Sequence, residues 1–128
     1  MCWKTIYRKS KKPHIAKRNI KVFKVVVIEQ DNEGNTIIKP KYRSKKLIYK
    51  LNKQYDTQIS IEDYSYVTII TKGFHSYAYR LLEYKGTGYC EAIMHCIIPK
   101  GTTYYLNEYG EYVSESLIPL SIEKEFWL

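Results

Sequence analysis

The sequence has little cysteine, and its three copies, Cys2, Cys90 and Cys96, show no Cys-x-x-Cys spacing. A disulfide framework needs an even set of cysteines and a structural zinc site needs closely spaced pairs, so the pattern argues against both. If residues 89–98 form one strand, Cys90 and Cys96 share a face but lie about 20 Å apart along it. We therefore expect buried, unpaired thiols.

A long apolar run is also missing, since the longest one near the N-terminus covers only residues 25–28. A secretory signal needs an apolar stretch of about 7 to 15 residues, and a membrane-spanning helix needs about 20. Basic residues continue where such a stretch would stand. The sequence thus predicts a soluble, cytoplasmic protein that does not contact a membrane.

Acidic residues are scarce in the first part of the chain. Residues 1–53 contain 16 of the 21 Lys and Arg but only three acids, whereas residues 54–128 contain five Lys and Arg and ten acids. The first part therefore has a charge of about +13 and the second about −5, within a total of +8. Such a separation favours a polyanion or an acidic protein surface as the partner.

Tyrosine is abundant, with 14 copies against three Phe and two Trp in 128 residues. Its ring and hydroxyl suit half-buried strands and wet interfaces. AT-rich codons, which also favour Lys, Ile and Asn, would produce the same excess. The remaining composition, 45% hydrophobic and 27% charged, is typical of a globular chain.

The pattern of apolar residues predicts a small α+β fold with a mainly antiparallel sheet. Ser76 is a suitable N-cap, and Ala78, Leu81 and Leu82 follow at helical spacing, so one short helix is expected over residues 76–84. The single domain covers residues 21–128 and follows a basic N-terminal arm, residues 1–20. The expected strands are residues 21–29, 36–39, 66–71, 89–98, 102–106, 112–113 and 117–122, with turns at 31–35 and a bulge or edge at Pro119.

Two groups of basic residues are candidates for binding phosphates, because Lys and Arg neutralise phosphates and release counterions. Tyrosines at 7, 42, 49 and 55 lie among them and could stack on bases. No helix-turn-helix, zinc-finger or RNP-type motif occurs, which favours non-specific binding. An acidic protein partner, or a solvated basic face without any ligand, would explain the same charges. The first group is Lys4, Arg8, Lys9, Lys11, Lys12, Lys17 and Arg18, and the second is Lys41, Arg43, Lys45 and Lys46.

A second candidate site is a ligand pocket formed by His75, Ser76 and His95. His75 stands at a strand end before the expected helix, where its side chain could face a ligand at the helix N-terminus. The alternative is a histidine that hydrogen-bonds within its own turn. The three histidines of the chain have no spaced cysteine or carboxylate partners, so we expect neither a metal nor a cofactor and assign no catalytic residue.

Three segments, GFHSY at 73–77, CIIPKGTTYY at 96–105 and GEYVS at 110–114, resemble a family of small uncharacterised proteins from gut Bacteroides and their phages. The Met-Cys start and residues 21–26 extend the resemblance over most of the chain. It implies a phage-associated structural or accessory component, in the cytoplasm or in a virion, and assembly with itself or into a larger phage particle. It implies no activity.

A second similarity is to ADP-ribosyltransferase-like domains, through the order of the first strand, Gly-Phe-x-Ser and Ile-Ile-Pro-Lys-Gly-Thr. The pattern needs an Arg or His, then a Ser, then a Glu four residues before the Pro, and these positions are occupied by Lys24, Ser76 and His95. Because the Glu is absent, the similarity implies nucleotide binding more than transfer from NAD. The sequence therefore favours a non-enzymatic binding protein, with a nucleotide-binding module or a phage-encoded inhibitor of a host protein as alternatives.

Overall fold

The computed structural model describes residues 5–8, 12–40, 47–64, 67–79 and 91–123 of the chain. Within these residues the fold is all-β, with twelve strands and no helix. The strands are β1 (Thr5–Arg8), β2 (His14–Ile15), β3 (Ile20–Gln30), β4 (Thr36–Pro40), β5 (Tyr55–Asp56), β6 (Ser60–Asp63), β7 (Val67–Lys72), β8 (Phe74–Tyr77), β9 (Glu91–Ile98), β10 (Thr103–Leu106), β11 (Glu111–Ser114) and β12 (Ser116–Ile122).

The prediction of an α+β fold with a helix over residues 76–84 is wrong. Ser76 and Tyr77 belong to strand β8, in which Phe74 and Ser76 are buried and the alternate residues are half-buried. Four register pairs join β8 to β11, and this pairing supplies hydrogen bonds that a short helix would gain only after a costly nucleus. Pairing with β11 thus overrides the helical spacing of the apolar residues. Residues 80–84 of the predicted helix lie outside the described residues.

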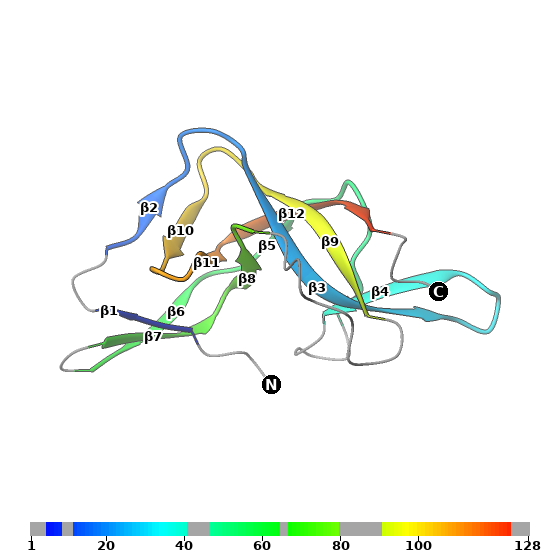
Figure 1. Cartoon of the computed structure of the whole chain (residues 1–128), viewed down its shortest axis with the longest axis horizontal. Coiled ribbons are helices and arrows are strands. Elements are labelled where there is room, and N and C mark those ends of the chain that lie inside the picture. The colour runs from blue at the N-terminus through cyan, green and yellow to red at the C-terminus, as the bar shows by residue number, and fades with distance from the viewer. Residues whose placement is uncertain (1–4, 9–11, 41–46, 65–66, 80–90, 124–128) are drawn as a thin grey trace.

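Strand β3 is the centre of the larger sheet, which has the order β2-β10-β11-β8-β3-β9-β12-β5 (Figure 1). One edge of β3 pairs with β9 from Ile20 to Val27, and its other edge pairs with β8 at Phe23 and with β4 from Val26 to Gln30. All of these pairings are antiparallel. The β-branched run of residues 21–29 is therefore confirmed as a strand.

The turn between β3 and β4 follows from local chemistry. Asp31 Oδ1 accepts hydrogen bonds from the backbone N–H groups of Glu33 and Asn35, each at 2.9 Å. Gly34 has a φ of 81°, which favours glycine, and its N–H bonds the carbonyl of Asp31. This confirms the predicted hairpin, and a register shift between Pro119 and Ser121 confirms the predicted bulge in β12.

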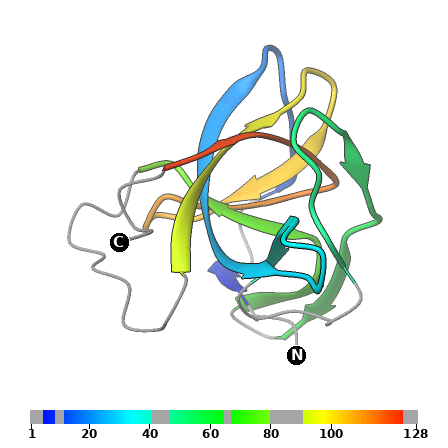
Figure 2. The same ribbon diagram turned by 90° about the vertical axis from the view of Figure 1, so that its right-hand side faces the viewer.

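The larger sheet curls around the main core, as its curvature in Figure 2 shows. Val22 and Val26 of β3 face Cys96 and Ala92 of β9 in register, and all four are fully buried. Both ends of the sheet reach this core. The contributing residues there are Ala16, Tyr104 and Tyr112 near one end, and Leu117 and Tyr55 near the other.

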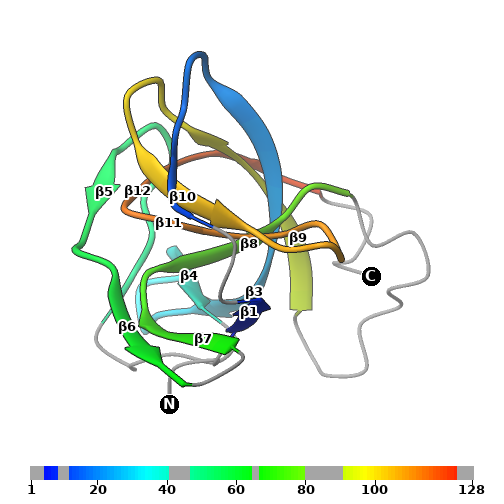
Figure 3. The same cartoon turned by 90° about the vertical axis from the view of Figure 1, so that its left-hand side faces the viewer.

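A smaller sheet, in the order β1-β7-β6, covers the outer face of β10 and β11 (Figure 3). Ile70 of β7 packs there with Tyr105 and Val113 in a second core. Gly73 links β7 to β8 with a φ of 149°, and a Cβ on it would lie 2.3 Å from Cγ1 of Val113. This close approach requires glycine at the link between the two sheets.

The predicted basic arm, residues 1–20, contributes one strand to each sheet. Strand β1 pairs with β7, and β2 pairs with β10. The division of the chain into an arm and a domain remains a prediction. No helix long and apolar enough to cross a membrane occurs in the part of the chain that the structure describes.

Candidate polyanion-binding groove

The segment between β2 and β3 is fixed to the turn between β9 and β10, and the two turns stand side by side (Figures 1 and 2). The N–H of Ala16 donates to the carbonyl of Thr102 at 2.9 Å, and the N–H of Gly101 donates to the carbonyl of Ala16 at 2.8 Å. The N–H of Lys100 donates to Oδ1 of Asn19 at 2.9 Å. Since Ala16 is only 2% exposed, it anchors the exposed residues on either side of it.

Side chains of the segment 13–21 form one wall of a groove with a volume of about 1020 Å³. Strands β10 and β11 form the other wall. Among the described residues, its lining includes three cationic side chains and no acidic one. The lining residues are Pro13, His14, Ile15, Lys17, Arg18, Asn19, Ile20, Lys21, Tyr104 and Tyr112.

The cations of the groove are exposed to solvent. Lys17, Arg18 and Lys21 are all exposed, and within the described residues none of them forms an ion pair with a carboxylate. A concave surface that gathers charge of one sign focuses the field there and attracts counter-ions. The groove is therefore suited to an anionic ligand.

Three aromatic rings form a row across the groove. His14 of β2 stands opposite Tyr104 of β10 in register, and their rings stack with centroids 5.4 Å apart and an interplanar angle of 27°. The ring of Tyr112 on β11 lies 5.5 Å from that of Tyr104. Tyr104 and Tyr112 also pack against the main core, so their rings are held in place, whereas His14 is exposed.

The hydroxyl of Tyr112 stays neutral in this setting. Partial burial raises its pKa above the ordinary value of 10.0, and the hydroxyls of Tyr104 and Tyr79 raise it further. At neutral pH the phenol is therefore a hydrogen-bond donor that adds no negative charge to the groove.

The structure brings together only part of the predicted basic groups. Lys17 and Arg18 line the groove, and Lys12 is exposed next to it in the sequence. The backbone of Arg8 belongs to β1 in the smaller sheet. The other predicted residues lie outside the described residues: Lys4, Lys9, Lys11, Lys41, Arg43, Lys45 and Lys46.

The sequence reasoning missed Lys21, His14, Tyr104 and Tyr112 as residues of this site. His14 and Tyr104 are far apart in the sequence and meet only because β2 pairs with β10. The single signal available was the recurrence of tyrosine in the 96–105 segment, which by itself predicted only a strand. The groove is thus a product of strand pairing.

The three residues of the second candidate site lie on both faces of the larger sheet, and a ligand pocket there stays a prediction. Tyr77 and His95 both pair with Phe23, so His95 lies on the face of the sheet that also presents His75, two residues before Tyr77. Ser76 faces the other side and is only 1% exposed. None of the three predicted pocket residues lines the groove.

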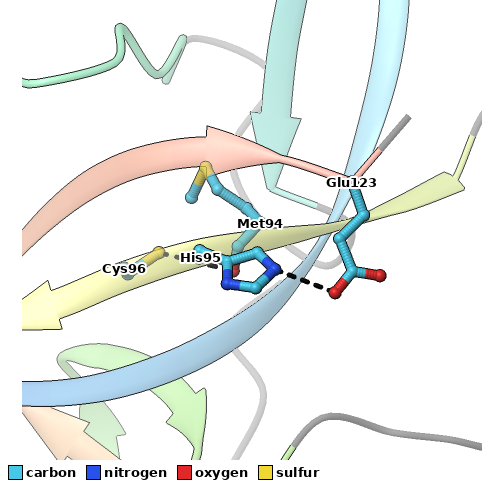
Figure 4. Close-up of polar contacts among 4 residues, drawn as sticks. All are labelled: Met94, His95, Cys96 and Glu123. Carbon is cyan, nitrogen blue, oxygen red and sulfur yellow. Dashed lines mark hydrogen bonds and ion pairs between the residues drawn. The ribbon is translucent and has the colours of Figure 1, made fainter. Parts of the chain in front are cut away.

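His95 is held by groups of the protein itself. Its Nε2 lies 2.8 Å from Oε1 of Glu123, just past the end of β12 (Figure 4). The ring of Phe23 packs edge-on against it, with centroids 5.1 Å apart. The carboxylate that the sequence pattern lacked next to His95 is therefore supplied from a distant strand.

Lys24, the residue at the first position of the ADP-ribosyltransferase-like pattern, points into the main core. It is 9% exposed, and its Nζ donates to the carbonyl of His75 at 2.6 Å. Cys96, which pairs with Val22, is fully buried, and burial raises the pKa of its thiol to about 12. The expectation of a buried thiol is confirmed for Cys96, while Cys2 and Cys90 lie outside the described residues.

Within the described ranges no group of three or more His, Cys, Asp or Glu is placed to hold a metal ion. No family model, curated protein or solved structure matches the chain. The resemblances to the Bacteroides phage family and to ADP-ribosyltransferase-like domains therefore remain predictions.

Proposed function

We propose that this protein is a non-enzymatic binding protein that holds nucleic acid through its phosphates, with little sequence preference. The observation that supports the proposal is the groove, which is lined by Lys17, Arg18 and Lys21 and by no acidic residue of the part of the chain that the structure describes. Its walls are strands and hydrogen-bonded turns, so the backbone that carries the three cationic side chains is held in place. Such preorganisation lowers the entropy cost of binding.

The physical basis is counterion release. Each phosphate that a Lys or Arg neutralises sets free condensed cations, so affinity falls steeply as salt rises. Phosphate contacts position a protein on nucleic acid but do not read its sequence. Three groove cations, together with the further basic residues of the first part of the chain, fit a ligand with many phosphates better than one with a single phosphate.

The proposal includes the setting that the resemblance implies: a phage-associated structural or accessory component, in the cytoplasm or in a virion. A component packed beside a genome would use a basic groove directly. The same groove would bind an acidic protein surface, and then the protein would act as an assembly factor or as an inhibitor of a host protein.

The test is the salt dependence of binding to a fluorescently labelled oligonucleotide of mixed sequence, measured by anisotropy. We expect binding at about 50 mM salt that weakens by at least tenfold at about 200 mM salt, with similar affinity for unrelated sequences. Poly-glutamate of similar charge serves as the competitor. Equal binding at both salt concentrations would contradict the proposal, and tighter binding of poly-glutamate would identify an acidic protein as the partner.

A further inference from the structure

We infer that the groove takes single-stranded nucleic acid, DNA or RNA, with unpaired bases stacked on the aromatic row that begins at His14 and Tyr104. This inference rests on the proposed function and adds the class of nucleic acid. The geometry of the aromatic rings supports it, whereas the cations of the groove support the proposed function.

The row follows neighbouring strands of the larger sheet. His14, Tyr104 and Tyr112 stand on β2, β10 and β11, with consecutive ring centroids 5.4 and 5.5 Å apart. Tyr79 is a further ring, beyond the end of β8, and it is 71% exposed. The ring of Tyr79 lies against Gly110, because a Cβ added to Gly110 would be 2.9 Å from Cε2 of Tyr79.

The backbone keeps Tyr79 beside β11. The N–H of Ala78 donates to the carbonyl of Gly110 at 2.8 Å, so the chain continues alongside β11 after β8 has ended. Tyr79 thus stands beside β11, next to the row of three rings formed by His14, Tyr104 and Tyr112.

The His14 end of the row is open to solvent. His14 stacks on Tyr104 with one face and is exposed, so its other face is available to a base. Lys17, Arg18 and Lys21 line the same groove and would contact the phosphates on either side of that base. Proteins that bind single strands combine these two elements, a cationic groove for the backbone and aromatic rings for the bases.

A duplex does not fit this arrangement as well. In a duplex the faces of the bases are covered by their neighbours, and only their edges are accessible in the grooves. Exposed ring faces therefore gain little from a duplex, whereas unpaired bases of any sequence offer a face to stack on. The volume of about 1020 Å³ is at the upper end of the range for small-molecule sites, which leaves room for more than a mononucleotide.

The first experiment uses the unaltered protein and needs no variant. Anisotropy is measured with a labelled oligothymidine, the same strand in a duplex, and an abasic oligonucleotide of equal length and charge. Each stacked base adds roughly 5-fold or more to affinity, so we expect the single strand to bind at least 10-fold more tightly than the abasic strand and the duplex. A further measurement with oligouridine compares RNA with DNA. A preference for the RNA strand or for the DNA strand supports the inference, which covers both.

The second experiment removes one ring at a time, and at position 104 it leaves an apolar side chain in place of the ring. Tyr104→Leu is compared with Tyr104→Phe, which retains the ring, and with His14→Ala at the exposed end. We expect Tyr104→Leu and His14→Ala to weaken binding of the single strand by about 5-fold each. Tyr104→Phe should bind as the original protein does, and all three variants should bind the abasic strand unchanged.

The outcomes separate this inference from the proposed function. Equal, salt-dependent affinity for the single strand, the duplex and the abasic strand would overturn the stacking inference and leave phosphate binding intact. Absence of binding to any of the three at low salt would overturn the proposed function itself. Loss of affinity in Tyr104→Phe as large as in Tyr104→Leu would assign the effect to the hydroxyl and would also overturn stacking.

Discussion

Lys21 and Lys24 stand three residues apart on β3, yet they belong to two different regions of the molecule. Lys21 is exposed and lines the groove. Lys24 points into the main core, where its Nζ donates to the carbonyl of His75 at 2.6 Å. The groove thus keeps its cations available to an outside anion, whereas the interior satisfies its cation with a backbone oxygen.

The comparison teaches that a count of basic residues does not measure binding capacity. A buried ammonium is stable only if the protein supplies acceptors for it, and those acceptors compete with any ligand. An exposed ammonium contributes little to folding but retains its charge for a partner. We therefore expect changes in the interior to alter stability and changes in the groove to alter binding.

The largest effect is expected in the interior, from Gly73→Ala. The new Cβ would stand 2.3 Å from Cγ1 of the fully buried Val113, on a backbone with a φ of 149°. We expect the free energy of unfolding to fall by about 3 kcal/mol, measured by urea denaturation. Gly101→Ala is the matched control, because its φ is 89° but no atom lies within 4 Å of the new Cβ. A similar loss in both variants would assign the effect to backbone strain alone.

The next effect is expected in the groove, from the combined change of Lys17, Arg18 and Lys21 to Ala. Loss of three phosphate contacts should weaken binding of a single strand by about 100-fold at about 0.1 M salt and lower the slope against log salt by about 2. The midpoint of urea unfolding should stay almost constant, because exposed residues change stability little. A large loss of stability with an unchanged salt slope would contradict the distinction between a groove that binds and an interior that stabilises the fold.

A smaller effect on stability is expected from Lys24→Ala. The change leaves the carbonyl of His75 without the charged donor and removes a buried aliphatic stem. We expect a loss of about 2 kcal/mol in the free energy of unfolding and unchanged affinity for nucleic acid. Lys21→Ala is the matched control, for which we expect weaker binding of nucleic acid and an almost unchanged free energy of unfolding. Weaker nucleic-acid binding by a folded Lys24→Ala protein would place Lys24 in the binding site.

The smallest effect near neutral pH is expected from Cys96 in the interior, whose contribution to stability changes only in alkaline solution. Burial raises the pKa of this thiol to about 12 from an ordinary 9.0, so the unfolded chain loses the proton first as pH rises. The stabilising contribution is complete below pH 9.0 and is lost as pH approaches about 12. Between these values the unfolding free energy should fall by about 1 kcal/mol per pH unit more than in Cys96→Ala. Parallel pH curves for the two proteins would contradict this.

Local rules predicted several elements of the fold correctly. The β-branched run at 21–29 became β3, the turn residues at 31–35 formed the hairpin through Asp31, and Pro119 lies at a bulge. Each of these depends on neighbours in the sequence, such as side-chain branching or a side chain that bonds its own backbone. The prediction of a helix was wrong because Ser76 pairs with strand β11, and the spacing of residues in the sequence does not reveal this pairing.

The candidate site was predictable only in part, for the same reason. Lys17 and Arg18 were found by charge alone, because a basic segment without acids is visible in the sequence. His14 and Tyr104 were not paired in advance, since their contact exists only where β2 meets β10. The carboxylate beside His95 was missed because Glu123 follows β12 and lies 28 residues from His95 in the sequence.

By itself, the sequence determined the charge separation and the strand character of this protein, because both follow from residue types and their neighbours. Only the tertiary structure decided which lysine is buried, which rings form a row and which histidine lies within hydrogen-bonding distance of a carboxylate. Antiparallel pairing of strands far apart in the sequence sets those contacts. The register of each pairing then sets the face on which each side chain lies, since a shift of one residue reverses it.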